Sequence, residues 1–264
     1  MSCLYKSTHL VFLLLLMFVL SCSHPQHEVK FHYLGHSSFY INFDDKISVL
    51  CDYGMENAYL EWGWDSPIYD AGTHEPDILC YSHTHDDHYD PERAAAFNSV
   101  RIMGDIDTNI CGLNIRSIPS SETDISRYDN YSYLFTYKGI SVLHLGDCQA
   151  DIMMINDPAH RWVLEQRFPI GCDIVIMPIE GTQKYLPQAV KMAELLEPKV
   201  LIPTHYWSNK YKQEFINQMI PAFSKKNKVL NIDNFDGNEF LYHKNKSKEG
   251  LTIPMLEPSA RETG

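Results

Sequence analysis

The sequence predicts a single α/β domain, and its length, composition and order of apolar segments lead to that prediction. The chain has 264 residues, enough for one large domain with a substantial buried core. Its hydrophobic fraction of 44% and charged fraction of 21% are typical of a globular protein. Strand-like apolar runs come first, followed by a helix, more strands and a helix–strand–helix order, without a strict strand–helix repeat.

The first part of the domain is predicted to consist mainly of strands. Short β-prone runs cover residues 31–34, 38–43, 46–50 and 78–81. Asp44 and Asp45 separate the second run from the third, which predicts a hairpin. A helix is expected to begin at Pro91 and to reach Phe97, because Asp90 can cap it and proline suits the first helical position.

The second part is predicted to alternate strands with helices. The expected strands cover residues 131–137, 140–145, 173–177 and 200–202, and the expected helices cover 188–196 and 211–223. We expect the domain to extend over residues 28–245 and to be followed by a polar tail over 246–264.

The net charge argues against one class of partner. The formal charge is −12, and no basic patch interrupts the acidic surface that this implies. A protein this acidic repels phosphate backbones, so we expect no nucleic-acid binding.

The N-terminus predicts export. Lys6 precedes an unbroken apolar run from Leu10 to Leu20, too short to span a bilayer and typical of a signal peptide. The run ends at Ser21-Cys22, which resembles a bacterial lipoprotein signal with cleavage before a lipidated cysteine. We therefore expect a signal peptide over 1–21, a linker over 22–27, and attachment through Cys22 to a bacterial membrane, on the periplasmic face or the cell surface. A plain secretory signal or a short membrane anchor are the alternatives.

The remaining cysteines are expected to be structural. Three of them lie in or beside apolar strand-like runs and are predicted to be small core residues: Cys51, Cys80 and Cys172. Cys148 is also expected in the core. No pair has the C-x-x-C spacing, which argues against a zinc ribbon.

A cluster of histidines and carboxylates is the strongest chemical signal in the chain. The segment His83-Thr84-His85-Asp86-Asp87-His88 follows a predicted buried strand and precedes a predicted helix. Two rigid flanks of this kind hold a ligand loop in place. Imidazole and carboxylate together suit Zn²⁺ and other first-row cations, so the segment predicts a metal site.

This segment resembles the H-x-H-x-D-H signature of the metallo-β-lactamase superfamily, and matches it in full. Further similarity follows the same order along the chain, at Leu143 to Asp147, Ile176 to Gly181 and Leu201 to Tyr206. The stretch from Tyr33 to Phe39 resembles the branch of ascorbate-6-phosphate lactonases and N-acyl-phosphatidylethanolamine phospholipase D-like proteins. The resemblance implies a four-layer αββα sandwich. It also implies the metal ligands His83, His85, Asp87, His88, Asp147 and His205, with Asp147 bridging two metals.

The chain departs from the family pattern at one ligand. The family usually supplies another histidine to the first metal, but this chain has no histidine between His88 and His144. Glu122 or His160 are the candidate replacements. One bound metal, or a weakly bound first metal, are the alternatives.

Three further residues are weighed as neighbours of the site. His36 is either a structural turn residue or a pocket residue, and Tyr206 either lines the pocket or packs in the core. His144 is expected to be packed or to support a ligand, because strand alternation points it away from Asp147.

The resemblance implies a metal-dependent hydrolase that uses a metal-bound hydroxide on an ester, lactone or phosphodiester bond of a small or lipid-like substrate. Asp87 would orient the nucleophile, and the cofactor would be one or two Zn²⁺, with Mn²⁺ or Fe²⁺ as alternatives. His85 stands where the superfamily's di-iron flavoproteins usually have glutamate, which favours hydrolysis. The alternative is a surface lipoprotein of the same fold that binds a metal or ligand without turnover.

Overall fold

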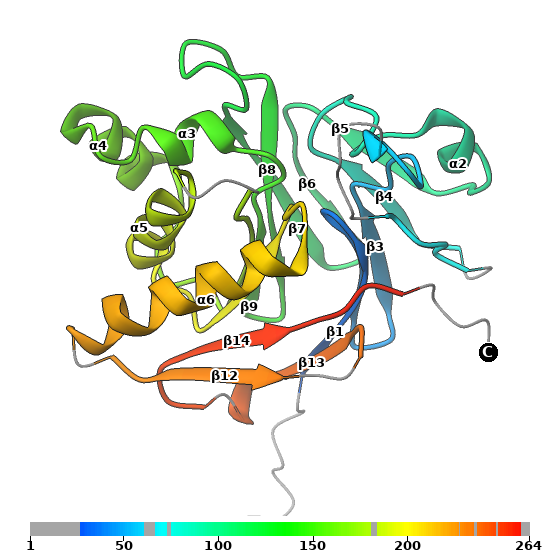
Figure 1. Cartoon of the computed structure of the whole chain (residues 1–264). Coiled ribbons are helices and arrows are strands. Elements are labelled where there is room, and N and C mark those ends of the chain that lie inside the picture. Colours follow the sequence, from blue (N-terminus) through cyan, green and yellow to red (C-terminus); the bar gives the residue numbers. More distant parts are fainter. Residues whose placement is uncertain are drawn as a thin grey trace, which may run out of the picture.

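Two β-sheets with helices on their outer sides form the protein (Figure 1). The computed structural model describes residues 27–60, 67–72, 75–180, 184–226, 228–234, 237–246 and 248–259. The expected signal peptide over 1–21 and Cys22 lie outside these ranges. Among the helices described, none is long and apolar enough to cross a membrane.

The first sheet has six strands and carries the N-terminal half of the chain. Its order is β13 (Glu239–His243), β1 (Glu28–Gly35), β2 (Ser38–Phe43), β3 (Ile47–Cys51), β4 (Ile78–Tyr81) and β5 (Val100–Met103). The helix α2 (Pro91–Ala95) covers its outer face, where Ala94 packs with Leu79 and Tyr81 in a small apolar cluster. The predicted hairpin at Asp44-Asp45 joins β2 to β3, which pair antiparallel.

The second sheet has eight strands. Its order is β12 (Leu230–Asn234), β14 (Leu251–Met255), β11 (Val200–Thr204), β10 (Ile174–Pro178), β9 (Ile140–His144), β8 (Asn130–Tyr137), β7 (Leu113–Ser120) and β6 (Asp107–Ile110). Helices on its outer side are α3 (Gln149–Met153), α4 (Pro158–Arg167), α5 (Leu186–Leu196) and α6 (Asn209–Ser224) (Figure 1). A 3₁₀ turn, η2 (Lys244–Lys246), follows β13.

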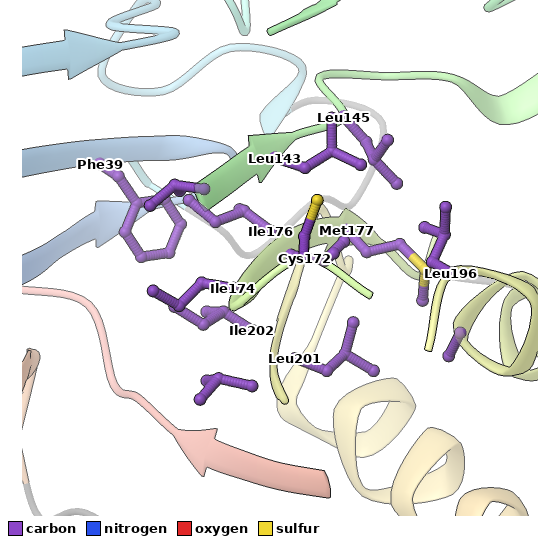
Figure 2. Packing of buried hydrophobic residues seen from close by; sticks show 14 of the residues in the cluster. Phe39, Leu143, Leu145, Cys172, Ile174, Ile176, Met177, Leu196, Leu201 and Ile202 are labelled. Atoms are coloured by element: carbon purple, nitrogen blue, oxygen red, sulfur yellow. The ribbon is translucent and has the colours of Figure 1, made fainter. Parts of the chain in front are cut away.

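The main core lies between the two sheets, and strand alternation decides which side chains enter it. Figure 2 shows Ile174 and Ile176 of β10 on the side that faces Phe39 of the first sheet. Met177 lies on the opposite side, toward Leu196 of α5. The strand is therefore buried on both faces, as parallel strands covered by helices usually are.

The expected four-layer αββα sandwich is confirmed by this arrangement of helices, two sheets and helices. The predicted strands and helices occur at the expected places, with shifts of one to three residues at their ends. The buried positions of Cys51, Cys80, Cys148 and Cys172 also agree with the prediction.

The polar tail expected over 246–264 differs from the structure. Leu251–Met255 is the fully buried strand β14, which pairs with β12 and β11 inside the second sheet. Its five residues, LTIPM, form a short apolar run between polar flanks, and only the neighbouring strands give it a place in the core. Strands β5 to β7 and helices α3 and α4 were also not anticipated.

Parallel pairing brings several strand ends to one edge of the molecule. In the second sheet β10 runs parallel to both β9 and β11, and in the first sheet β3 runs parallel to β4. The carboxyl ends of parallel strands lie at the same edge of a sheet. The residues that follow these five strands can therefore meet, although they are far apart in sequence.

Candidate metal centre

The histidine-rich loop is held at both ends. Its N-terminal end follows the buried strand β4, and its C-terminal end runs into α2. Asp90 caps that helix, accepting hydrogen bonds from the backbone N–H groups of Glu92 at 2.8 Å and Arg93 at 3.1 Å. The sequence prediction of this cap is confirmed, and the cap fixes the direction in which the loop leaves the site.

The six predicted ligands converge on one region, together with two residues that were not predicted as ligands. In four overlapping groups, the donor atoms lie within 4.8 Å of one another. The groups are His83, His85 and Asp87; His83, His88 and Asp147; His36, Asp87, His88 and His205; and Asp147, Glu180 and His205. Because the groups share members, the arrangement can hold one cation or two neighbouring cations.

Asp87 lies at the centre of these groups. Its Oδ2 accepts a hydrogen bond from His36 Nε2 at 2.8 Å and lies 3.4 Å from His205 Nε2. Burial opposes ionisation, but His88, His205 and His36 outweigh it and hold the pKa of Asp87 below its ordinary value. Burial and the nearby His205 lower the pKa of His36 to about 3, so His36 is neutral at neutral pH. Asp87 is therefore an ionised acceptor that His36 orients.

Asp52 holds two histidines of the site by hydrogen bonds, and it was not identified from the sequence. It is fully buried, and its Oδ2 accepts hydrogen bonds from His88 Nδ1 and His144 Nε2, each at 2.9 Å. Its Oδ1 accepts the backbone N–H of Ser82 at 2.7 Å. Burial raises the pKa of Asp52, but the two histidines lower it more, so its pKa lies below the ordinary range. The carboxylate holds His88 with Nε2 toward the centre.

Glu180 is the second site residue that was not predicted. It lies two residues after the end of β10 and is 2% exposed, and its Oε1 lies 2.5 Å from His205 Nδ1. Burial opposes protonation of His205, but Glu180 and Asp147 raise its pKa well above the ordinary value. A cation at Nε2 would displace that proton, because a histidine must be neutral on the side that binds metal.

Of the two candidate replacement ligands, Glu122 lies beside the histidines of the loop and His160 lies beside Asp151. Glu122 Oε1 lies 2.9 Å from His85 Nδ1, and its Oε2 lies 3.4 Å from His83 Nε2. Burial raises the pKa of Glu122 above its ordinary value. His160 lies on α4, with Nε2 at 3.0 Å from Asp151 Oδ1. Neither residue belongs to the four donor groups found in the described residues, so only the contacts with His83 and His85 distinguish Glu122.

The other candidate neighbours are placed by their contacts. His36 lies in the site, with its ring 4.0 Å from the ring of His205. Tyr206 packs in the hydrophobic core, with the ammonium of Lys212 5.1 Å from its ring centre. His144 contacts Asp52 and belongs to none of the donor groups found in the described residues.

Backbone conformation marks the same residues. His36, Asp52, Glu180 and His205 have φ values of 50°, 45°, 47° and 52°, in the left-handed region that non-glycine residues rarely adopt. Each of them lies one or two residues after the end of a strand. Such strain persists where the surrounding structure fixes it, and it often marks functional sites.

The donor atoms fit a divalent first-row cation. Within the described part of the chain, four of their buried atoms have no hydrogen-bond partner: His83 Nε2, His88 Nε2, Asp87 Oδ1 and Asp147 Oδ1. Burying such atoms without a partner costs free energy. Burial, together with Glu180 and Glu122, raises the pKa of Asp147 well above its ordinary value. Imidazole nitrogens and carboxylates that converge in this way are the ligands that such cations use, and bound cations would give these atoms partners.

Asp52 and Glu180 share a signal that the sequence did carry. Each is the first polar residue after a buried strand, as His83 and Asp147 nearly are. Strand ends at one sheet edge are where ligands gather in α/β folds. Their roles depend on which strands are neighbours, which the sequence pattern does not reveal.

Known structures share this fold. A proposed Zn-dependent hydrolase of the metallo-beta-lactamase superfamily from Thermotoga maritima superposes with a TM-score of 0.56 at 19% identity, over 87% of this chain and 100% of that chain. A proposed metal-dependent hydrolase from Parabacteroides distasonis gives 0.54 at 22% identity, over 76% and 90%. CmlA, a diiron beta-hydroxylase from Streptomyces venezuelae, gives 0.52 at 13% identity, over 83% and 54%.

At these identities the similarity shows only a shared fold. Family membership is shown by a match of the sequence itself. No curated protein shows significant sequence similarity to the chain. Residues 30–205, two thirds of the chain, match the family described as the beta-lactamase superfamily domain. This range includes every predicted ligand from His83 to His205. The chain therefore belongs to the beta-lactamase superfamily.

Proposed function

We propose that the chain is a metal-dependent hydrolase that cleaves an ester, lactone or phosphodiester bond in a small or lipid-like substrate. The observation that carries this proposal is the convergence of buried donor atoms that have no hydrogen-bond partner in the described part of the chain. Burying such a cluster lowers the stability of the fold unless the cluster binds a ligand, so its presence supports a bound cation.

The donor set divides into two halves. His83 and His85, together with the adjacent carboxylate of Glu122, would hold one cation. Asp87, His88 and His205 would hold the other, and Asp147 belongs to donor groups with members of both halves. When bound, zinc or a similar cation lowers the pKa of water toward neutrality and polarises the bond under attack.

The chain's own residues would orient the nucleophile. Asp87 stays ionised at neutral pH, and its Oδ1 has no partner among the described residues. This atom can accept a hydrogen bond from the attacking water and fix its direction. His36 donates to the other oxygen of Asp87 and keeps the carboxylate from rotating. Asp52 and Glu180 hold His88 and His205 in the matching orientations.

The substrate class rests on charge and on resemblance. The net charge of −12 repels nucleic acids. An anionic substrate would therefore have to be attracted by the metal centre itself. The stretch from Tyr33 to Phe39 supports the branch that includes lactonases and phospholipase D-like proteins, and places His36 beside Asp87. We therefore place lactones and lipid phosphodiesters first among the substrates.

Turnover of generic substrates tests the proposal. The purified chain, reconstituted with Zn²⁺ or Mn²⁺, is assayed with bis(p-nitrophenyl) phosphate, p-nitrophenyl acetate and a γ-lactone. We expect metal-dependent hydrolysis of at least one of them, and a loss of about 10²-fold or more in Asp87→Asn, the usual size of a general-base effect. Asp86→Asn is the matched control, since Asp86 is the exposed neighbour in the same loop.

Two results would contradict the proposal in different ways. Full activity in a metal-loaded Asp87→Asn variant would remove Asp87 from the mechanism. Bound metal without turnover of any of the three substrates would favour the alternative, a surface protein of this fold that binds metal or a ligand without catalysis.

We also propose that the protein is exported and lipid-anchored through Cys22, on the basis of the signal-like N-terminal sequence. Expression in a bacterium, followed by membrane fractionation, tests this. The wild type should sediment with membranes and incorporate labelled palmitate, and Cys22→Ala should lose the label. A soluble, unlabelled wild type would support a plain secretory signal.

A further inference from the structure

The donors around the first cation position are unusual in their chemistry. The two carboxylate oxygens of Glu122 lie beside the imidazoles of His85 and His83, at 2.9 and 3.4 Å. His83 is 7% exposed, and its Nε2 has no hydrogen-bond partner in the described ranges, so a donor nitrogen is directed into the site. This half of the centre therefore contains two histidines and Glu122, with Asp87 as the donor that it shares with the other half.

The fold holds Glu122 in this place. Its backbone N–H donates to Asp129 Oδ1 at 2.8 Å, and its carbonyl accepts the N–H of Ala150 at 2.9 Å. The preceding residue, Ser121, donates its N–H at 2.9 Å to the buried Asp151, which pairs with Arg167 at 3.0 Å. The side chain of Glu122 is 12% exposed. The fold therefore holds Glu122 in the site, and its carboxylate is not a mobile surface group.

The identity of the donors affects which cation fits best. Imidazole suits zinc, copper, iron and nickel, whereas carboxylate oxygens suit harder ions such as manganese, and two histidines with one carboxylate are the facial set of non-haem iron(II) sites. Zinc binds more tightly than manganese to most nitrogen and oxygen sites, so donor identity acts on the ratio of the two affinities. Replacing an imidazole by a carboxylate reduces the advantage of zinc.

We propose that Glu122 makes the His83–His85–Glu122 position a site for Mn²⁺ or Fe²⁺, with a preference for zinc that is reduced at least tenfold relative to a three-imidazole version of the same site. This inference concerns metal binding at the centre on which the proposed function depends. It can be tested by metal content without any substrate. A failure of the metal-selectivity proposal is therefore distinguishable from a failure of the proposed hydrolysis.

Metal competition in three variants gives the test. The metal-free full chain is equilibrated with Mn²⁺ and increasing Zn²⁺, and bound metals per chain are measured by mass spectrometry after removal of free ions. The same experiment is run without oxygen for Fe²⁺. Glu122→His supplies the third imidazole, and Glu122→Gln keeps the shape but removes the charge. Asp124→Asn is the control, because this fully exposed carboxylate lies in the same loop.

The expected result is that Glu122→His needs at least tenfold less Zn²⁺ than the wild type to displace half of the bound Mn²⁺. Glu122→Gln should lose about one metal per chain, and Asp124→Asn should match the wild type. Equal displacement curves for Glu122→His and the wild type would overturn the proposed selectivity. Unchanged metal content in Glu122→Gln would overturn ligation by Glu122.

Discussion

Glu180 Oε1 lies 2.5 Å from His205 Nδ1, and this contact links the end of β10 to the end of β11. Both residues have positive φ values, and both are almost completely buried. The contact directs His205 Nε2 toward Asp87 and Asp147, at 3.4 and 3.5 Å. Glu180 thus determines how a metal ligand is presented.

Removal of this carboxylate should weaken metal binding. We expect Glu180→Ala to lose about 10- to 100-fold in affinity, the usual effect of losing a residue that orients a metal-binding histidine. Glu180→Gln retains a hydrogen-bond acceptor and should recover part of the loss. Isothermal titration with Zn²⁺ measures both, and wild-type affinity in Glu180→Ala would show that His205 needs no orienting partner.

Asp52 should matter both for stability and for metal binding. Asp52→Ala leaves His88 and His144 buried beside a missing partner, which we expect to cost about 3–5 kcal/mol of unfolding free energy. Urea denaturation checks this. Asp52→Asn keeps the volume and should fold, but it should bind the cation about 10- to 100-fold more weakly. Unchanged binding in Asp52→Asn would mean that the loop alone orients His88.

Gly54 should tolerate no side chain. A Cβ at this position would lie 2.3 Å from the carbonyl carbon of Asp87, so the ligand loop would have to move. We expect Gly54→Ala to destabilise the protein by about 1–3 kcal/mol, as overpacking does, and to reduce metal content. Gly237→Ala is the control, since nothing lies within 4 Å of its added Cβ. Equal melting temperatures and metal content for both variants would contradict this prediction.

Asp173 should make stability depend on pH. It accepts hydrogen bonds from Lys199 Nζ at 2.7 Å, Ser141 N at 2.9 Å and the hydroxyl of Tyr242 at 3.0 Å, and so joins the two sheets. Burial raises its pKa, but Lys199 and the other donors lower it more, so the folded pKa lies below the ordinary value of 3.8.

The sign of this effect follows from the direction of the shift. A lowered folded pKa stabilises the protein above pH 3.8, and the contribution is lost as the pH falls through the folded value. Asp173→Asn should therefore be less stable than the wild type at pH 7, by about 1–3 kcal/mol. The difference should shrink below pH 3.8, which urea midpoints at pH 7 and pH 3 would measure. A constant difference at both pH values would exclude this linkage.

Removing the metal should lower the melting temperature. Without a cation, Glu122 is close enough to Asp87 and to Asp147 for like-charge repulsion, and burial raises the pKa of Glu122 and Asp147. A ligand present at 100 times its Kd stabilises a protein by about 2.7 kcal/mol. Treatment with a chelator should therefore destabilise the chain by about this amount, and added Zn²⁺ should restore it. An unchanged melting curve would argue against tight metal binding.

Much of the fold could be read from local patterns. The β-prone residues of Ser38–Phe43 and the cap at Asp90 predicted their elements with nearly correct ends, because residue propensity and capping are local properties. Leu251–Met255 could not be recognised as a core strand, since its burial depends on two strands that flank it only in three dimensions.

The sequence by itself determined the chemistry of the centre. The order of residue types from His83 to His88, with Asp147 and His205 further along, specifies imidazole and carboxylate donors behind buried strands. Only the tertiary structure decided which other side chains join them. Strand pairing brings Asp52 and Glu180 to their histidines and Glu122 to the first position, while His160 pairs with Asp151. Residues so far apart in sequence meet because of the way the strands pair, and sequence spacing does not encode which strands are neighbours.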